Sequence, residues 1–399
     1  MSDWPRARLG DLAQWFSGGT PRTSEPSYWG GDIPWISAAS LKEFFISTSD
    51  RNVTADGAAS GTRLVPPRSI IFVVRGMSLM SEFRLGITMR EVAFGQDCKA
   101  LIANRGVDPY FLAYAIKAQT ARILDLVDAA GHGTGRLQTD RIADLRIAIP
   151  ADLREQKRYS SLIKAFDDKI AANDRIADSS RALALSHLRS AVEFGGAVEL
   201  QIGPVATSLN RGIAPRYTDD PLQLCVLNQK CIRDGRVSFG PARRTLVDNV
   251  PSQKLLEQHD VLVNSTGVGT LGRVARWTER IPSTVDSHVT VVRFDPAKVD
   301  PVCAGLAMLS VEHEIEALGE GSTGQTELSR ARLSTFELTV PTRDRAERLR
   351  PILDALEDRG HQALEESLSL AELRDTLLPK LMSGEIRVRD AGKIVEDVT

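Results

Sequence analysis

The sequence predicts an α+β fold, in which two duplicated globular domains are joined by two long antiparallel, coiled-coil-like helices with pseudo-twofold symmetry. Segments of the first half recur in the same order about 191 residues later. Each copy begins with short β-like runs broken by Gly, Pro, Ser and Asn, and it ends in a long charged helical segment. A chain of 399 residues is also too long for one ordinary core.

Matching segments occur along the whole of each half. Their offsets stay between about 186 and 194 residues, which indicates gene duplication with small changes in loop length. Residues 8–12 return as 201–205, the apolar strand 69–73 returns as 260–264, the helix start 107–109 returns as 299–301, and 145–150 returns as 336–341.

Long charged helices are predicted after Pro150 and Pro341. Apolar residues recur there every seven positions, which predicts a supercoiled seam between the two helices. A helix of about 40 residues extends about 60 Å, so we expect the pair to act as a spacer between the globular copies. The alternative is that each helix packs only on its own domain. The seam residues are Ile163, Ile170, Ala177, Leu349, Leu356, Leu370 and Leu377.

These patterns divide the chain into five parts. They are a first domain at 1–150, a first spacer helix at 151–196, a second domain at 197–341, a second spacer helix at 342–386 and a C-terminal tail at 387–399.

The composition is that of a globular protein, with 42% hydrophobic and 26% charged residues. No apolar stretch approaches the length of a membrane helix, and the N-terminus has no apolar signal core, so we expect a cytoplasmic protein. The four cysteines form no CxxC pair and we expect them to be buried, reduced thiols. The net charge of −2 is unlike that of a general nucleic-acid binder.

Several short patterns imitate enzyme motifs. Gly267–Gly272 matches GxGxxG, but the residues after it are β-like, so we interpret it as a Gly-rich hairpin or a DNA-facing loop rather than a dinucleotide site. Residues 108–111 weakly resemble the Asp-Pro-Pro-Tyr motif of amino-methyltransferases. Both copies keep Asp-Pro there, so a helix start with an Asp N-cap explains the pattern better.

We find no further catalytic or metal-binding motif and expect no catalytic, cofactor or metal site in this chain. The paired acids Asp167-Asp168 and Asp219-Asp220 are interpreted as solvated charges. His132 and His288 have no evident partner in the sequence, so core or loop roles are expected.

The first copy carries residues that point to a family. Residues 17–21 (Ser-Gly-Gly-Thr-Pro) and 28–36 (Tyr-Trp-Gly-Gly-Asp-Ile-Pro-Trp-Ile) closely resemble the opening of a target-recognition domain in the DNA-specificity (S) subunit of type I restriction–modification systems. Residues 131–135 resemble the end of such a domain, and residues 377–386 resemble the distal helix of the family. The second copy lacks both opening motifs, so single residues transfer less well there.

This resemblance implies two target-recognition domains that bind the two halves of a bipartite site in double-stranded DNA, spaced by the long helices. The half-sites would lie about one helical turn, roughly 34 Å, apart. The implied partners are methyltransferase (M) subunits, two in number, and restriction (R) motor–nuclease subunits. S-adenosylmethionine, ATP and Mg²⁺ would belong to those partners and not to this chain.

We expect DNA contacts from polar or cationic residues in Gly-rich loops, because Arg recognises guanine and Ser and Thr are permissive. For each residue the alternative is a solvated surface charge. Trp29 and Trp35 are expected in the core. The DNA-binding candidates are Arg22, Ser24, Tyr28, Arg75, Ser78, Arg84 and Arg90 in the first copy, and Arg211, Arg216, Arg243, Arg244, Ser265, Thr266 and Arg273 in the second.

Three other functions remain open at this stage. One is a specificity subunit of a system that only methylates, or one fused elsewhere to its catalytic chains. Another is a duplicated scaffold for protein partners without DNA, which the near-neutral charge favours. The last is an enzyme that binds a nucleotide at Gly267–Gly272.

Overall fold

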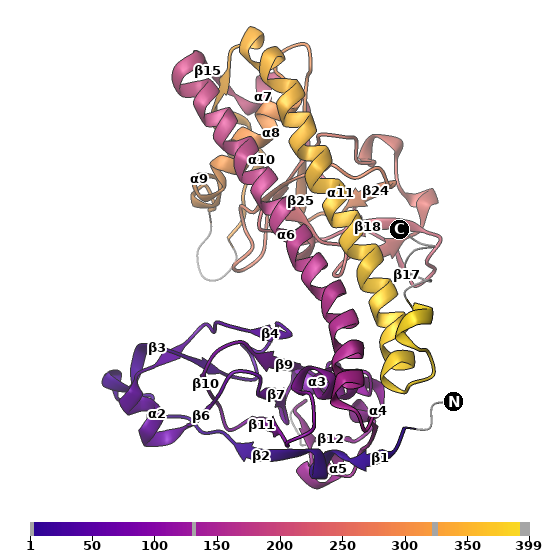
Figure 1. Cartoon of the computed structure of the whole chain (residues 1–399). Coiled ribbons are helices and arrows are strands. Elements are labelled where there is room, and N and C mark those ends of the chain that lie inside the picture. The colour runs from indigo at the N-terminus through magenta and orange to yellow at the C-terminus, as the bar shows by residue number, and fades with distance from the viewer. Residues whose placement is uncertain (1–3, 130–132, 321–325, 392–399) are drawn as a thin grey trace. The chain divides into compact units, whose positions relative to one another are not determined.

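The computed structural model describes residues 4–129, 133–320 and 326–391. It divides into two compact units: unit 1 comprises residues 1–172 and 366–399, and unit 2 comprises residues 173–365. Two long helices, α6 (Leu153–Gly195) and α11 (Arg343–Met382), each contribute one half to either unit (Figure 1). The predicted α+β fold, with two globular copies joined by two long helices, is confirmed.

Unit 1 is built on a five-stranded sheet and a four-stranded sheet. The larger has the order β2-β11-β7-β9-β4, and the smaller has the order β5-β3-β10-β6. The strands are β2 (Ala13–Ser17), β11 (Cys98–Ala103), β7 (Ile70–Val73), β9 (Leu85–Thr88), β4 (Phe45–Ile46), β5 (Asn52–Val53), β3 (Trp29–Ile36), β10 (Val92–Phe94) and β6 (Arg63–Val65), with β1 (Arg6–Arg8), β14 (Arg146–Ala148), β12 (Val127–Ala129), β13 (Gly135–Leu137) and β8 (Arg75–Gly76) in small sheets. The helices are α1 (Leu9–Leu12), η1 (Pro26–Tyr28), α2 (Ala55–Gly61), η2 (Ser78–Met80), α3 (Pro109–Lys117), α4 (Thr120–Leu124) and α5 (Thr139–Ala143).

Unit 2 repeats this plan with two four-stranded sheets, β16-β25-β22-β23 and β17-β21-β18-β24. The strands are β16 (Ala206–Arg211), β25 (Val289–Phe294), β22 (Val261–Asn264), β23 (Val274–Arg276), β17 (Tyr217–Thr218), β21 (Arg243–Thr245), β18 (Leu224–Leu227) and β24 (Ser283–Val285), with β19 (Ile232–Arg233) paired to β20 (Arg236–Val237) and β15 (Ala197–Gln201) paired to β26 (Glu337–Pro341). The helices are α7 (Ile202–Val205), η3 (Gln229–Cys231), η4 (Val247–Asn249), η5 (Ser252–Lys254), α8 (Pro301–Ser310), α9 (Glu312–Ala317) and α10 (Arg330–Thr335).

The two units repeat each other down to strand register. In unit 1, Trp35 pairs with Ala93 in the parallel strands β3 and β10. In unit 2, Val226 pairs with Thr284 in β18 and β24, and both residues lie 191 positions further along the chain. A one-residue slip would turn every side chain of a strand to the opposite face, so this agreement confirms the predicted duplication at the level of single residues.

The helix starts predicted from Asp-Pro are also confirmed. The Asp108 carboxylate accepts a hydrogen bond of 2.8 Å from the Phe111 amide at the start of α3, and Asp300 accepts one of 2.8 Å from the Cys303 amide at the start of α8. Proline follows each cap at the first helical position, where its missing N–H leaves no bond unmade.

In each unit, the long helices complete the core of the globular part. In unit 1, Ile163 of α6 and Leu377 of α11 pack in one cluster with Phe72 and Phe111. In unit 2, Leu188 and Leu349 do the same with the core of that unit. The helices therefore pack on each other and on the domain beside them. Among the predicted seam residues, Ile163, Ala177, Leu349, Leu370 and Leu377 are buried, and Ile170 and Leu356 are partly buried.

Gly360 of α11 faces α6 within unit 2. A Cβ atom on Gly360 of α11 would lie 3.7 Å from the Cα of Ala177 and 3.7 Å from the Cβ of Ser180, both on α6. These are ordinary van der Waals distances, so the approach of the two helices there does not require a glycine.

Two expectations about buried groups had different outcomes. All four cysteines are buried and free, as predicted, and burial raises the pKa of Cys98 to about 12. The prediction that Asp167 is a solvated charge is wrong, because its carboxylate is buried in the core of unit 1. His132 and the tail residues 392–399 lie outside the described residues.

Candidate nucleic-acid interface

The GxGxxG segment of unit 2 is a tight loop between two antiparallel strands. Residues 265–273, here called tip loop 2, connect β22 to β23, and no helix begins there. Gly267 has a φ of +114°, and a Cβ on it would lie 2.3 Å from the Thr270 Oγ1. A dinucleotide site of this type needs a helix N-terminus facing the pyrophosphate, so the hairpin interpretation is confirmed.

Unit 1 has the corresponding loop at residues 74–84, here called tip loop 1, between β7 and β9. The loops begin alike, because Val74 donates its amide hydrogen to the Asp97 carbonyl and Ser265 donates to the His288 carbonyl, both at 2.9 Å. A buried leucine anchors each loop in its core, Leu79 in unit 1 and a second one, Leu271, in unit 2.

The two loops differ in charge at equivalent positions. Arg75 of tip loop 1 pairs with Arg136 of β13, so two arginine side chains start from neighbouring backbone positions. In unit 2 the equivalent bridge joins Thr266 to Glu327, and Glu327 forms an ion pair with Arg211. Tip loop 1 is therefore cationic where tip loop 2 is neutral or acidic.

The sheet β5-β3-β10-β6 of unit 1 and the equivalent sheet β17-β21-β18-β24 of unit 2 each carry an arginine stacked on an aromatic ring. The Arg51 guanidinium carbon lies 3.6 Å from the ring centroid of Trp29, and that of Arg243 lies 3.4 Å from the centroid of Tyr217. Arg51 and Arg243 occupy equivalent places in the repeat, just before or within the strand that pairs with β3 or β18. Stacking fixes a guanidinium while leaving its N–H groups available for phosphates or base edges.

Most candidates of the first copy are at the surface. Arg90 donates to the Asp32 carbonyl at 3.1 Å, and Arg84 bonds to Glu82 at 2.8 Å. Trp35 is in the core, as expected, whereas Trp29 is only partly buried. Arg22, Ser24, Arg75 and Arg90 are exposed, and Tyr28, Ser78 and Arg84 are partly buried.

In the second copy, three of the candidate arginines lie on or next to the sheet β17-β21-β18-β24. Arg216 precedes β17, and Arg243 and Arg244 lie on the adjoining strand β21. Arg216, Arg243 and Arg244 are exposed, and Arg211, Thr266 and Arg273 are partly buried. Ser265 is a correction: its side chain is fully buried and its hydroxyl is hydrogen-bonded to that of Thr290, so it is not available to DNA.

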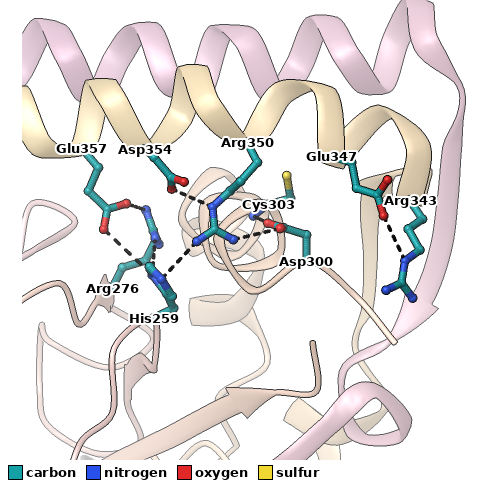
Figure 2. Close-up of polar contacts among 9 residues, drawn as sticks. All are labelled: His259, Arg276, Asp300, Cys303, Arg343, Glu347, Arg350, Asp354 and Glu357. Atoms are coloured by element: carbon teal, nitrogen blue, oxygen red, sulfur yellow. Dashed lines mark hydrogen bonds and ion pairs between the residues drawn. The ribbon is translucent and has the colours of Figure 1, made fainter. Parts of the chain in front are cut away.

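A polar network joins the globular part of unit 2 to α11 (Figure 2). Arg350 of α11 donates to the Asp300 carboxylate at 3.0 Å and to Asp354 at 2.6 Å. Arg276 of β23 forms an ion pair of 2.7 Å with Glu357, which also lies on α11. We call Arg276, Asp300, Arg350 and Glu357, together with His259, the unit 2 clasp.

His259 lies between the two arginines of this clasp. Its Nδ1 is 3.3 Å from an Arg276 nitrogen, and its Nε2 is 3.2 Å from an Arg350 nitrogen (Figure 2). Burial, followed by the positive charge of Arg276, lowers the pKa of His259, against the opposing effect of Glu357. The clasp is therefore built around a neutral imidazole.

Unit 1 has its own clasp, made with different groups. The buried Asp167 carboxylate of α6 accepts from the Tyr114 hydroxyl at 2.7 Å and from Arg374 of α11 at 2.6 Å. Gln156 of α6 accepts from the Asp108 amide at 2.7 Å. Burial, followed by the negative charge of Asp167, raises the pKa of Tyr114. Each clasp holds a globular part, and with it the tip loop, on the long helices.

Sequence reasoning missed several of these residues. Arg51, Arg136 and Tyr217 were not among the DNA-binding candidates. The repeat contained the signal for Arg51, because it lies 192 positions before the candidate Arg243. His288, expected to lack a partner, is bonded through Nδ1 to the Thr266 hydroxyl at 2.7 Å.

Two further observations concern the described residues only. None of their helices combines the length and apolar character needed to cross a membrane. No group of three or more of their His, Cys, Asp or Glu side chains is placed to hold a metal ion.

Residues 1–179 match the family model described as type I restriction modification DNA specificity domain. The chain is 26% identical over 161 residues to the specificity subunit of the type I restriction enzyme EcoR124I/EcoR124II of Escherichia coli, and 28% identical over 175 residues to that of MjaIX of Methanocaldococcus jannaschii. These matches cover 40% and 42% of this chain, and only 40% and 39% of the respective relatives.

A solved structure resembles nearly the whole chain. It is the crystal structure of a type I restriction-modification system S subunit from M. genitalium, which is 16% identical with a TM-score of 0.58. The likeness covers 95% of this chain and 96% of that one, and it shows a shared fold.

Proposed function

We propose that the chain, whose residues 1–179 match the type I restriction modification DNA specificity domain, recognises a bipartite target in double-stranded DNA, one half with each unit. The observation that carries this proposal is the register-matched duplication. Two units with the same strand pairing present equivalent loops that carry different side chains. Equivalent loops suit two half-sites of one duplex, and different side chains suit two different base sequences.

Exposed arginines support DNA as the ligand. The stacked Arg51 and Arg243 and the loop residue Arg75 present N–H donors that suit phosphates and guanine. The net charge of −2 is low for a protein that binds DNA alone. We therefore propose that partner subunits supply part of the phosphate contacts.

Those partners would be two methyltransferase subunits and the restriction motor–nuclease subunits of the complex. S-adenosylmethionine, ATP and Mg²⁺ would be bound by the partners, and this chain would position them without catalysing a step itself. We propose that the domains are bounded at 1–150 and 197–341 and that the helical segments at 151–196 and 342–386 set the distance between half-sites. A complex that acts on genomic DNA would work in the cytoplasm.

The test is single-molecule methylome sequencing of cells that express this chain together with the methyltransferase encoded beside it. We expect a methylated motif of two short halves separated by unspecified bases. The motif should disappear when this chain is deleted and the methyltransferase is kept, which is the matched control.

A protein scaffold is the second candidate, because the near-neutral charge favours it. If the chain forms a stable complex with the methyltransferase and no new methylation appears, the scaffold replaces the DNA-recognition proposal. A methylated motif that is continuous rather than divided would also contradict a bipartite target.

A further inference from the structure

Each tip loop exposes a large apolar side chain directly after a glycine, and tip loop 1 also exposes Met80, at 51%. Met77 of tip loop 1 is 75% exposed and Val268 of tip loop 2 is 89% exposed. The two residues lie 191 positions apart, which is the offset that relates the two units, and each follows a glycine. The same feature therefore occurs twice, at one structural position, in two sequences that otherwise differ.

Tip loop 2 is a fixed support for Val268. The buried Asn264 side chain donates to the Thr270 carbonyl and to the Gln229 carbonyl, both at 2.9 Å. Leu271 donates its amide hydrogen to the Gly267 carbonyl at 3.0 Å, which closes the turn. These bonds fix the loop backbone on both sides of Val268, so its exposed side chain is presented from an ordered turn.

Each tip loop ends in an arginine, of which Arg84 is ion-paired with Glu82. Arg273, at the end of tip loop 2, donates to the Gly269 carbonyl at 2.8 Å. Arg84 ends tip loop 1 in the equivalent position. A loop that combines a fixed apolar tip with an arginine at its base suits a polyanion that has an apolar group within reach of its phosphates.

Double-stranded DNA has one such group on its base edges. In the major groove the four bases present hydrogen-bond donors and acceptors, and thymine alone adds a C5-methyl group. Neither Val268 nor Met77 has a strong donor or acceptor, so neither can distinguish bases by hydrogen bonding. The thymine methyl is the ligand that their chemistry matches.

We propose that Val268 and Met77 are specificity-determining residues, each packing on the C5-methyl of a thymine in the half-site that its unit binds. This inference rests on the proposed function and names the contact chemistry of its two reading loops. According to this proposal, one A·T pair in each half-site is recognised through an apolar contact with its thymine. The flexible Met77 would tolerate more variation in geometry than the branched Val268.

The test uses the complex of this chain with its methyltransferase and the target found by methylome sequencing. Every thymine of the two half-sites, on both strands, is replaced in turn by deoxyuridine, which removes only the methyl group. We expect one position in each half-site at which this replacement weakens binding about fourfold, the effect of losing one buried methyl-sized group.

Variants then assign each sensitive thymine to its loop. Val268→Ser should weaken binding to the thymine target and should abolish sensitivity to deoxyuridine in one half-site, leaving the other unchanged. Met77→Ser should do the reverse. Leu222→Ser is the matched control, because Leu222 is 91% exposed on another turn of unit 2, and it should change neither.

The outcomes separate this inference from the proposed function. Complete absence of sequence-specific binding would overturn the proposed function itself. Specific binding that no deoxyuridine substitution weakens, or half-sites without an A·T pair, would overturn the thymine contact alone. Deoxyuridine sensitivity that persists fully in Val268→Ser and Met77→Ser would also overturn it, because another residue would then make the contact.

Discussion

Units 1 and 2 share a backbone fold, but equivalent buried polar side chains in the two units are bonded to different kinds of partner. At the start of the central strand, unit 1 has Ser69, whose buried hydroxyl donates to the Pro66 carbonyl at 2.8 Å. The equivalent residue of unit 2 is Asp260, whose buried carboxylate accepts two bonds from Arg293, at 2.8 and 2.7 Å. A neutral pair in one unit stands where an ion pair stands in the other.

The two helix-cap aspartates differ in the same direction, although the unit 1 clasp keeps a buried ion pair of its own between Asp167 and Arg374. Asp108 of unit 1 is bonded to the Ser160 hydroxyl of α6 at 2.9 Å, whereas its counterpart Asp300 is bonded to the Arg350 guanidinium of α11. Strand register and helix caps are therefore the constant part of the duplication, and charge is the part that diverged. We expect unit 2 to depend more strongly on pH and on the completeness of its ion pairs.

The largest difference should come from the buried carboxylate of unit 2. Asp260→Ala removes the two bonds between Asp260 and Arg293, and Arg293 keeps Glu257 and the Leu255 carbonyl as partners. The loss of a buried, charge-assisted pair should cost about 1.5–3 kcal/mol of the free energy of unfolding of unit 2. Ser69→Ala in unit 1 removes a hydroxyl only and should cost about 1 kcal/mol. Hydrogen exchange of amides in β22 and β7 measures the two units separately in one chain.

The double variant Asp260→Leu with Arg293→Met is the control for this measurement, because it removes both charges and fills the space. It should recover most of the lost stability. Equal costs for Asp260→Ala and Ser69→Ala would contradict the view that the two units differ in their dependence on charge.

A smaller difference should appear as the pH is lowered. The pKa of His259 in the folded chain is below its value of about 6.5 in the unfolded chain. The unfolded chain then binds a proton that the folded chain does not, so the stability of unit 2 should fall as the pH drops below about 6.5, by up to about 1.4 kcal/mol per pH unit. Arg276 and Arg350 oppose protonation, and Glu357 and Asp354 favour it.

The matched variant is His259→Asn. His259 has a φ of +71°, a backbone conformation that asparagine tolerates better than other side chains do. Lowering the pH from 7 to 5.5 should reduce the Tm of unit 2, measured by thermal unfolding, less in this variant than in the parent chain. An identical slope in both would show that other groups govern the acid response.

The smallest expected effect concerns the charge of the tip loops and rests on the proposed DNA binding. Arg75→Ala should reduce the dependence of the logarithm of the binding constant on the logarithm of the salt concentration by about 1, because one phosphate contact is lost. Thr266→Ala, the equivalent change in unit 2, should leave that slope unchanged. The control is Arg105→Ala, at the end of β11 far from Asp97 and the loop. A slope change as large for Arg105→Ala would remove the tip loop from the interface.

The sequence was informative wherever structure depends on local pattern. The Asp-Pro caps at Asp108 and Asp300 and the hairpin at Gly267–Gly272 follow from neighbouring residues, and all three predictions are confirmed. The division of the chain into repeats follows from offsets that need no knowledge of contacts.

The errors arose where partners come from distant segments. Asp167 was interpreted as solvated because its neighbours in α6 are charged, yet its partners Tyr114 and Arg374 lie 53 and 207 residues away. Ser265 was predicted to contact DNA, but it is buried, with its hydroxyl bonded to that of Thr290 on β25. Spacing within one segment carries no signal of such contacts, so burial at these positions required the three-dimensional structure.

The division of the chain between the units also bears on how it folds during synthesis. Unit 2 is continuous in sequence, from residue 173 to residue 365, whereas unit 1 needs residues 366–399 in addition to the first 172. Leu377, Leu378 and Leu381, which pack in the core of unit 1, are synthesised after the whole of unit 2. Domains usually complete themselves in the order of synthesis. Here the core of unit 1 stays incomplete until the residues after 365 have been made, and unit 2 can complete its core before that.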